Sequence, residues 1–542
     1  MPLPPPHHRR PAAVPGRPAA RRGRDRRATV LHPAPGRPAV AGEPPRVAVA
    51  GGGIAGLAAA TALAERGVRV TVLEREPRLG GRLAGWPVTL ADGSAVTMGR
   101  GFHAFFRQYY NLRGLLRRVD GSLGMLSGLP DYPLVHSGGA RDGFARVPRT
   151  PPWNALGFAA LSPTFTLPGL LRMDPVAALP LLDVRVPEVF EQLDGISAAD
   201  FLDRVRFPAG ARHLAFQVFS RSFFADPGEL SAAELALMFH IYFLGSGEGL
   251  LFDVANEPFP AALWEPLAKY LSGHGAETLT DTAVEAVSPT ASGGYEVAAA
   301  GGAPQRYDAV VLALDTGGLR QVVAGSPRLG DAAWRARIAR LRTAPPFLVT
   351  RLWLDRPVRP ERPGFLGTSG YGPLDNVSVL ERWEGEAARW ARRTGGSVVE
   401  LHAYAVPPGA DRAAVQEELL AGLHRLWPET RPARVVDAVH EWRADCPLFA
   451  VGSFADRPPV RTPDPGVVLA GDCVRADLPV ALMERAATTG FLAANALLER
   501  WGVRGQTLWT VPNAGRSAPL RALAALGGRE GGRERRRARR HA

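Results

Sequence analysis

The segment 46–74 constrains the fold more than any other part of the chain. It reads RVAVAGGGIAGLAAATALAERGVRVTVLE: an apolar run, a glycine-rich turn, an alanine-rich stretch and a second apolar run. The turn fits the pattern Gly-x-Gly-x-x-Gly, which is informative only when a strand precedes it and a helix follows. We therefore predict strands over 47–50 and 68–73, with a helix over about 55–66 between them.

The residues of this unit have distinct expected roles in binding a dinucleotide. Gly51 permits the tight turn, Gly53 lets the backbone approach a pyrophosphate, and Gly56 lets the helix pack closely on the strand. The pyrophosphate would lie at the positive N-terminal end of the helix. Glu74 closes the second strand and would accept hydrogen bonds from a ribose diol. The segment therefore predicts a dinucleotide-binding domain.

The loop that follows Glu74 distinguishes between the two common dinucleotides. It reads Arg-Glu-Pro-Arg-Leu-Gly-Gly-Arg over 75–82, an extension that a nicotinamide nucleotide does not need. The part from Arg78 to Arg82 resembles the R-x-G-G-R extension of the flavin-dependent amine oxidase and phytoene desaturase superfamily. The resemblance implies FAD as the cofactor, with this loop crossing it and Arg82 supporting its phosphates.

A second motif near the C-terminal end resembles the same superfamily. Residues 466–472 (GVVLAGD) form an apolar run that ends in Gly-Asp, which implies that Asp472 contacts the ribityl-phosphate region. A helix is expected over 481–498, with its N-terminus and its dipole directed at the flavin, and the backbone near Val284 is expected at the adenine. The predicted cofactor-binding residues are Gly51, Gly53, Ile54, Ala55, Gly56, Glu74, Gly81, Arg82, Val284, Gly471, Asp472 and Met483.

These assignments predict an α/β fold in which the FAD-binding domain is discontinuous. The domain is Rossmann-like, of the glutathione-reductase type, and comprises residues 46–100, 268–345 and 462–500. An inserted α+β substrate domain comprises residues 101–267 and 346–461. Residues 347–354 (FLVTRLWL) are expected to form the first strand of the second insertion.

Net charge and cysteine content exclude several classes of protein. The net charge is +13, but residues 1–45 contribute +7 and residues 529–542 contribute +5. We expect disordered tails over 1–45 and 515–542, a nearly neutral body and no nucleic-acid partner. Two cysteines, Cys446 and Cys473, cannot form a disulfide framework or a cysteine-based zinc site, so no metal is expected and the compartment is reducing, hence cytoplasmic. Cys473 is interpreted as a packed residue rather than a covalent flavin link.

Three aromatic-rich segments point to one branch of the superfamily. Residues 98–112 (MGRGFHAFFRQYYNL) place a Gly-x-His segment after a flavin-domain strand, and residues 213–226 and 231–253 are rich in Phe and Leu. Together they resemble the bacterial β-carotene desaturase/methyltransferases, the isorenieratene synthases. The chain departs from related desaturases in that Gly99 and Arg100 replace an acid often seen there, which puts the subfamily assignment in doubt.

The resemblance implies that β-ionone rings of β-carotene become trimethylphenyl rings. A ring carbon that bears two methyl groups cannot become aromatic until one methyl leaves it. Hydride loss to oxidised flavin, a 1,2-methyl shift and proton loss would form one double bond, and a second two-electron oxidation would complete the arene. Water must be excluded because it would trap the cation. His103 is the candidate catalytic residue, either as a base or as a group beside the flavin.

Alternatives remain at this stage. Another carotene desaturase or isomerase without a methyl shift would share these motifs, as would a flavin amine oxidase, although Lys269 is the only lysine in the chain. Oxygen and a quinone are both open as the electron acceptor. The apolar stretch 155–171 is either a buried loop or a patch that dips into a bilayer. We expect an apolar carotenoid substrate and peripheral association with a membrane.

Overall fold

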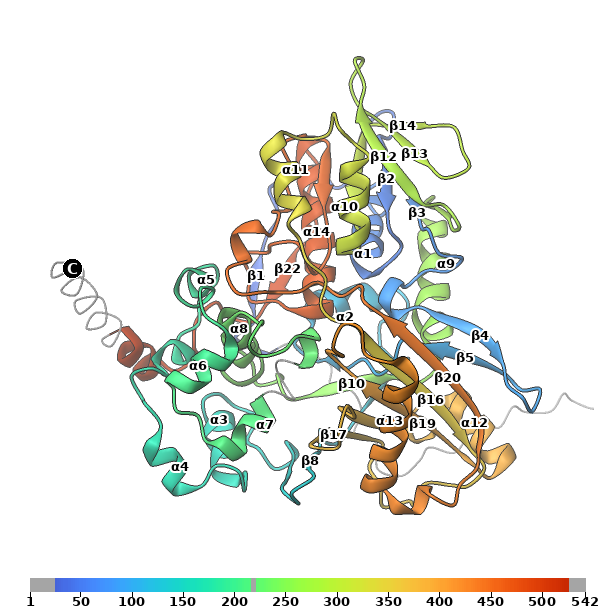
Figure 1. Cartoon of the computed structure of the whole chain (residues 1–542). Helices are drawn as coiled ribbons and strands as arrows, with labels where there is room; N and C mark the ends of the chain where they lie inside the picture. Colours follow the sequence, from blue (N-terminus) through green and yellow to red (C-terminus); the bar gives the residue numbers. More distant parts are fainter. Residues whose placement is uncertain (1–24, 216–220, 526–542) are drawn as a thin grey trace, which may run out of the picture.

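The computed structural model of the chain describes residues 25–215 and 221–525. Figure 1 shows a parallel sheet with its helices in the upper part, an antiparallel sheet with two helices at the lower right, and a group of short helices at the lower left. Residues 1–24 and 526–542 are the outer parts of the two tails for which we expect disorder. They lie outside the described residues.

The predicted unit 46–74 forms the centre of a five-stranded parallel sheet with the order β11-β3-β2-β15-β21. Its strands are short and almost wholly apolar, because helices cover both faces of a parallel sheet. Helix α1 (Ile54–Ala64) follows the first strand and is buried along its whole length. The strands are β2 (Arg46–Ala50), β3 (Arg69–Leu73), β11 (Glu277–Leu279), β15 (Ala309–Leu312) and β21 (Val467–Leu469).

Helix α14 (Leu482–Arg500) packs against α1 at very short range. A Cβ atom added to Gly490 would lie 2.2 Å from the backbone oxygen of Ala55, so the two helices touch backbone to backbone. Gly56 has the same role inside the first unit, since its Cβ would lie 1.9 Å from the oxygen of Gly51. Through these contacts, α1 near the start of the chain and α14 near its end pack side by side.

Residues 277–289 contribute two strands that belong to different sheets. Strand β11 joins the parallel sheet beside β3, whereas β12 (Val284–Pro289) begins a three-stranded antiparallel sheet with β13 (Tyr295–Ala299) and β14 (Gln305–Tyr307). Helices α9 (Glu265–Gly273), α10 (Thr316–Ala324) and α11 (Ala332–Ala339) complete this part of the molecule.

A seven-stranded sheet is the largest element of the second half of the molecule. Strand β16 spans Phe347–Leu354, as predicted. The order is β20-β16-β19-β18-β17-β8-β9, so the sheet combines strands from both insertions. The other strands are β8 (Leu134–His136), β9 (Arg141–Asp142), β17 (Phe365–Ser369), β18 (Asn376–Val379), β19 (Ser397–Ala403) and β20 (Val435–Arg443), covered by α12 (Gly385–Thr394) and α13 (Arg412–Leu426).

Short helices and ribbons connect the two large sheets. The buried helix α8 begins after Ser231, whose hydroxyl accepts a hydrogen bond from the Ala233 N–H. Glu234 is buried in an ion pair with Arg457 and Arg485. The helices are α2 (Tyr110–Leu116), α3 (Trp153–Leu161), α4 (Leu167–Arg172), α5 (Glu188–Leu193), α6 (Ala198–Arg204), α7 (Ala209–Ala215) and α8 (Ala232–Phe239); the ribbons are β4 (Gly85–Thr89) with β5 (Ala95–Gly99), and β10 (Phe252–Ala255) with β6 (Phe105–Phe106) and β7 (Leu126–Gly128).

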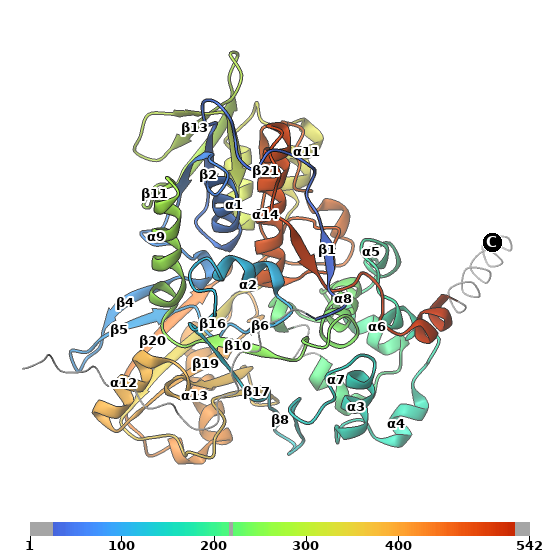
Figure 2. The ribbon, with the colours of Figure 1, turned by 180° about the vertical axis from the view of Figure 1, so that it is seen from behind.

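The expectation of disordered tails is wrong for the described residues of both. Strand β1 (Thr29–Leu31) pairs with β22 (Leu508–Thr510), as Figure 2 shows for β1 beside the C-terminal strand. Asp25 forms an ion pair with Arg516, with 2.5 Å between Oδ1 and Nη2. Composition alone misses this arrangement, because three residues of a polar, proline-rich segment are enough for a strand when a partner strand supplies the hydrogen bonds.

The α/β fold class expected from the sequence is confirmed, whereas the exact limits of the two domains stay a prediction. The parallel sheet draws its strands from three separate stretches of the chain. Within residues 25–215 and 221–525, no helix has the length and apolarity that crossing a membrane requires.

The contact at Gly490 yields a stability prediction. Gly490→Ala should lower the free energy of unfolding by about 1–3 kcal/mol, because the added methyl group overpacks the contact with α1. Thermal unfolding measures the change. The control is Gly273→Ala at the end of α9, where the added Cβ meets nothing within 4 Å. Equal melting temperatures for the two variants would contradict the close packing.

Candidate active site

One cavity of about 440 Å³ lies between the parallel sheet and the seven-stranded sheet. The predicted cofactor residues come from four distant parts of the chain, and all of them except Gly56 line this cavity. Gly56 instead serves the packing of α1, as described above. The lining residues from the prediction are Gly51, Gly53, Ile54, Ala55, Glu74, Gly81, Arg82, Val284, Gly471, Asp472 and Met483, and His103 lines the cavity as well.

The glycine-rich turn leaves room beside the N-terminus of α1. Gly51 has a φ of +107°, and a Cβ there would lie 2.3 Å from the oxygen of Ala313. Gly53 caps the helix and faces Gly81, whose own added Cβ would come within 3.2 Å of the Gly53 Cα. Side chains at Gly51, Gly53 and Gly81 would fill the space beside the helix N-terminus. Because glycine has none, a ligand can approach the backbone closely there.

Glu74 lies at the carboxyl end of β3 and holds the same turn in place. Its Oε2 accepts a hydrogen bond of 2.6 Å from the Gly52 N–H, and its Oε1 accepts one of 2.9 Å from the Glu76 N–H. Burial raises the pKa of Glu74 despite these bonds. The carboxylate keeps further lone pairs for a ligand hydroxyl, and the ribose contact stays a prediction.

The motif that contains Arg82 and the motif that contains Asp472 meet at one wall of the cavity. Arg82 Nη2 lies 2.6 Å from Asp472 Oδ1, although the two residues are 390 positions apart. Burial alone would lower the pKa of Arg82, but the carboxylate of Asp472 raises it well above its ordinary value. Gly471 (φ +145°) lies in the turn before α14, and Met483 lies in the first turn of α14. Both residues line the same wall of the cavity.

This donor set fits FAD. A glycine cradle at a helix N-terminus suits a pyrophosphate, a buried carboxylate suits ribose hydroxyls, and Arg82 supplies positive charge beside the phosphates. The predicted residues other than Gly56 would hold the cofactor, and each of these contacts stays a prediction. Cys473 is buried in the hydrophobic core and is absent from the lining of this cavity. Within the described ranges, no group of His, Cys, Asp and Glu side chains could hold a metal ion.

The other half of the cavity is aromatic. Phe102 stacks on Phe365 with ring centroids 4.1 Å apart, and Tyr132 contacts both Phe365 and Phe252. The aromatic segment 102–110 divides between two roles: Phe102, Phe106 and Tyr109 line the cavity, whereas Phe105 and Tyr110 pack into the core. The aromatic lining comprises Phe102, Phe106, Tyr109, Tyr132, Phe144, Phe224, Tyr242, Phe252, Phe347 and Phe365.

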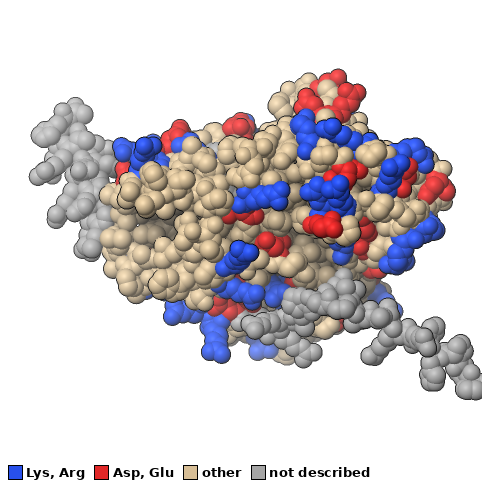
Figure 3. All heavy atoms as spheres, turned by 90° about the horizontal axis from the view of Figure 1, so that it is seen from below, with Lys and Arg blue, Asp and Glu red and all other residues tan. Residues whose placement is uncertain are grey.

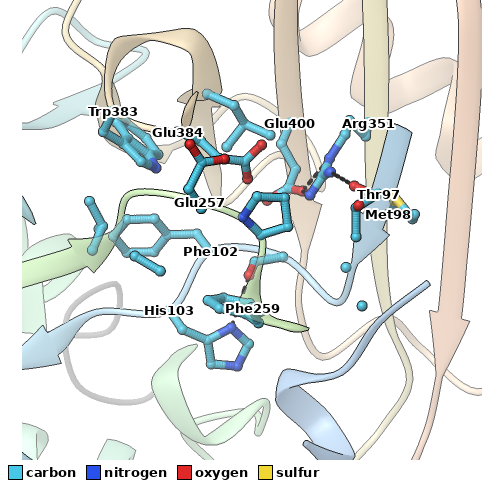
Figure 4. Close-up of a pocket in the computed structure, with 17 residues that line it drawn as sticks. Thr97, Met98, Phe102, His103, Glu257, Phe259, Arg351, Trp383, Glu384 and Glu400 are labelled. Atoms are coloured by element: carbon cyan, nitrogen blue, oxygen red, sulfur yellow. Dashed lines mark hydrogen bonds and ion pairs between the residues drawn. The ribbon is translucent and has the colours of Figure 1, made fainter. Parts of the chain in front are cut away.

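His103 lies where this aromatic half borders a second, smaller cavity. Its Nδ1–H donates a hydrogen bond of 2.9 Å to the Gly101 oxygen, and its ring meets the edge of Phe259. Burial lowers the pKa of His103 to about 4, so its imidazole is neutral at physiological pH. Figure 4 shows His103 and Phe102 below the polar side chains of the smaller cavity. The catalytic role of His103 stays a prediction.

The smaller cavity is built around a buried ion pair. Arg351 on β16 donates through Nε and Nη2 to Glu400 Oε2, at 3.0 and 2.7 Å, and through Nη1 to the Thr97 oxygen, as Figure 4 shows. Burial alone would raise the pKa of Glu400, but Arg351 and His402 lower it to about 2. Burial raises the pKa of the neighbouring Glu384 to about 7.

Polar residues on the seven-stranded sheet are the part of the site that the sequence analysis missed. His402, Tyr404, Asp375 and Asn376 line the main cavity among the aromatic rings. Burial raises the pKa of Asp375 to about 7, and Arg221 pairs with its carboxylate at 3.0 Å. The detectable signal was the alternation Glu-x-His-x-Tyr over 400–404, which places three polar side chains on one face of an otherwise apolar strand.

Comparisons with known proteins agree with this architecture. The family model described as flavin containing amine oxidoreductase matches residues 54–498. The chain is 73% identical to the carotenoid phi-ring synthase of Streptomyces griseus over 506 residues, which cover 93% of this chain and 98% of that protein. It is 28% identical to the carotenoid phi-ring synthase of Chlorobaculum tepidum, over 87% and 91% of the two chains.

Among solved structures, a triple mutant of putrescine oxidase redesigned in its cofactor binding superposes with a TM-score of 0.62. It is 18% identical and covers 84% of this chain and 99% of its own. At that identity, the likeness concerns the fold alone.

Replacement of Glu74 tests the cofactor site. Glu74→Ala should weaken FAD binding by about 10- to 100-fold, because a charged hydrogen-bond acceptor and the support of the glycine turn are both lost. Titration of the apoprotein with FAD, followed by flavin fluorescence, measures the affinity. The matched control is Glu296→Ala on β13, which removes an exposed carboxylate that does not line the cavity. Unchanged FAD affinity in Glu74→Ala would remove Glu74 from the site.

Proposed function

The chain belongs to the family of flavin containing amine oxidoreductases and is an FAD-dependent oxidoreductase; we propose that it desaturates the β-ionone rings of β-carotene, with a 1,2-methyl migration, to give the aromatic rings of an aryl carotenoid such as isorenieratene. The 73% identity to a protein named for a carotenoid ring supports a carotenoid as the substrate. An apolar, ring-bearing substrate also suits the aromatic half of the cavity.

The observation that carries this proposal is the division of one cavity into a polar half and an aromatic half. The polar half holds the glycine turn, Glu74 and the pair of Arg82 with Asp472. The aromatic half begins at Phe102 and His103, next to the predicted cofactor residues. A substrate ring bound among the aromatic side chains would therefore lie beside the redox cofactor.

The protein's own residues supply binding, orientation and the exclusion of water. Bound FAD supplies the two-electron oxidation of the ring. The aromatic faces of Phe102, Phe365 and Tyr132 favour positive charge, so they stabilise a cationic ring through their quadrupoles. A ring bound among these aromatic side chains would displace water, which would otherwise trap the cation before a methyl group moves. His103, with its neutral imidazole, borders the place where the two halves meet.

Membrane contact is the second part of the proposal. Helices α3 and α4 expose several large apolar side chains, including Trp153 (62% exposed), Leu167 (70%) and Leu171 (79%). The segment 155–171, for which a buried loop was one expectation, is thus helical and largely exposed. Figure 3 shows the underside of the molecule, whose left part carries few charged side chains. We propose that this surface inserts into the apolar part of a bilayer.

A column of aromatic rings connects this surface with the cavity. Phe144 lines the cavity and stacks on Phe158 of α3, with 5.0 Å between centroids. Phe158 in turn meets Phe165, which lies just before α4. Because a carotenoid is dissolved in lipid, an entry between α3 and α4 would spare it a passage through water.

The products formed in a cell that accumulates β-carotene test the reaction. Expression of the chain should yield a pigment with four hydrogens fewer per processed ring, an unchanged carbon count and an aromatic ring signal. Chromatography, mass spectrometry and proton NMR measure these properties, with cells carrying an empty vector as the control. Loss of hydrogen without an aromatic signal would show a desaturase that moves no methyl group.

Binding to vesicles tests the membrane surface. The double variant Leu167→Ser/Leu171→Ser should bind phosphatidylcholine vesicles about tenfold or more weakly. The reason is that two leucine side chains are no longer transferred from water into the apolar part of the bilayer. Flotation of the FAD-loaded protein with vesicles measures binding. The matched control is Leu279→Ser/Val451→Ser, which removes two exposed apolar residues elsewhere. Equal flotation of both double variants would place the contact on another surface.

A further inference from the structure

We propose that Tyr404 is the proton acceptor of the ring reaction and that His402 and Glu400 form, with it, a relay from the aromatic cavity to a buried carboxylate. The proposal rests on the proposed function, because only a substrate that loses a proton needs such a group. It concerns residues that the FAD motifs do not include and that lie on the opposite wall of the cavity.

The register of the seven-stranded sheet assembles the relay. Glu400 and His402 alternate along β19, and Tyr404 continues the same face just beyond its end. Arg351 on β16 is the cross-strand partner of Glu400, and Asn376 on β18 is the cross-strand partner of His402. The three adjacent strands thereby hold every member of the relay on rigid backbone.

The carboxylate decides which nitrogen of His402 carries the proton. Glu400 is ionised and has no proton to donate, and its Oε1 lies 3.0 Å from His402 Nε2. Nε2 therefore carries a hydrogen and donates it to Glu400, which outweighs the longer contact of 3.3 Å from the Phe102 N–H. In the neutral imidazole, Nδ1 is then an acceptor, and the Tyr404 hydroxyl donates to it at 2.7 Å.

The phenol oxygen of Tyr404 keeps one lone pair toward the cavity. It donates its hydrogen to His402 and accepts a hydrogen bond of 3.0 Å from Asn376 Nδ2, which leaves one of its two lone pairs. Tyr404, His402 and Asn376 line the main cavity, whereas Glu400 lines the smaller cavity behind them. His402 and Tyr404 therefore both border the main cavity, but only the phenol has an unshared lone pair there, and the carboxylate of Glu400 stays in the smaller cavity.

The proton step balances without any further reactant. After hydride loss and the methyl shift, a C–H bond of the cationic ring breaks, and its electron pair becomes the new double bond. The proton passes to the oxygen of Tyr404 as the phenol's own proton passes to His402 Nδ1. The resulting imidazolium is held by Glu400 through Nε2–H, while Arg351 binds the other carboxylate oxygen. No group changes its oxidation state in this step.

Two other acid–base groups near the ring are either already engaged or only weakly basic. The carboxylate of Asp375 accepts from Arg221 and, at 2.6 Å, from the Tyr404 N–H. His103 uses Nδ1 to bind the Gly101 oxygen, and its low pKa of about 4 makes its imidazole a weak base. Burial raises the pKa of Tyr404 well above its ordinary value, so the residue is a neutral phenol that needs His402 to take its proton.

A single-turnover experiment tests the relay. FAD-loaded full-length protein is mixed without oxygen with β-carotene in phosphatidylcholine vesicles, in H2O and in D2O. One FAD accepts one pair of electrons, so the product measured by chromatography is the carotenoid that has lost two hydrogens in the first oxidation step. The wild type should be slower in D2O, because exchangeable protons move in the relay. Tyr404→Phe should lower the rate by about 100-fold or more and abolish the solvent isotope effect. The control Tyr371→Phe removes a hydroxyl from a tyrosine that lines neither cavity and should change neither.

His402 is a positioning residue, and His402→Gln is the second variant. It should lose the solvent isotope effect with FAD content and melting temperature unchanged, which a merely structural role would not predict. If Tyr404→Phe matches Tyr371→Phe in rate and isotope effect, the relay is wrong and the proposed function stands. If the isotope effect disappears in His103→Asn but persists in Tyr404→Phe, His103 is the base. If the wild type leaves β-carotene unchanged, the proposed function fails and the relay with it.

Discussion

The contact between helices α1 and α14 is the constraint on which the rest of the molecule depends. Gly490 allows the two helices to approach backbone to backbone, and Gly56 allows α1 to lie directly on its own turn. Because α1 follows the first strand and α14 follows the last strand of the parallel sheet, this contact joins the two ends of the chain. Arg82 and Asp472, 390 positions apart, then meet at one wall of the cavity.

The buried charges that border the aromatic half of the cavity are paired. Arg351 and Glu400 form an ion pair at the smaller cavity, and the Arg221 guanidinium binds Asp375 in the lining of the main cavity. An unpaired charge among the rings would be costly to bury and would draw in water. With the charges paired, the aromatic wall can stabilise positive charge on a bound ring without a counter-ion beside it. His103 and Tyr404, which also line the cavity, are neutral there.

Local patterns predicted the elements that depend on near neighbours in the sequence. The strand–turn–helix–strand unit lies within a residue or two of its expected limits, and β16 matches its prediction residue for residue. Prediction failed where the partner is distant. The segment 25–45 looks disordered by composition, yet β1 pairs with a strand almost five hundred residues away. The apolar stretch 155–171 is helical, and only its neighbours decide that much of it is exposed.

The sequence by itself determined the dinucleotide fold and the residues that form the polar half of the cavity. Those residues belong to short motifs in which each residue type has one role. The glycines allow a tight turn and close approach, the acid accepts hydrogen bonds from a ribose, and the arginine supports the phosphates. The tertiary structure alone decided the aromatic half and the group of Glu400, His402 and Tyr404. Strand register and the packing of two sheets place those side chains, and neither is encoded in the spacing of residues along one strand.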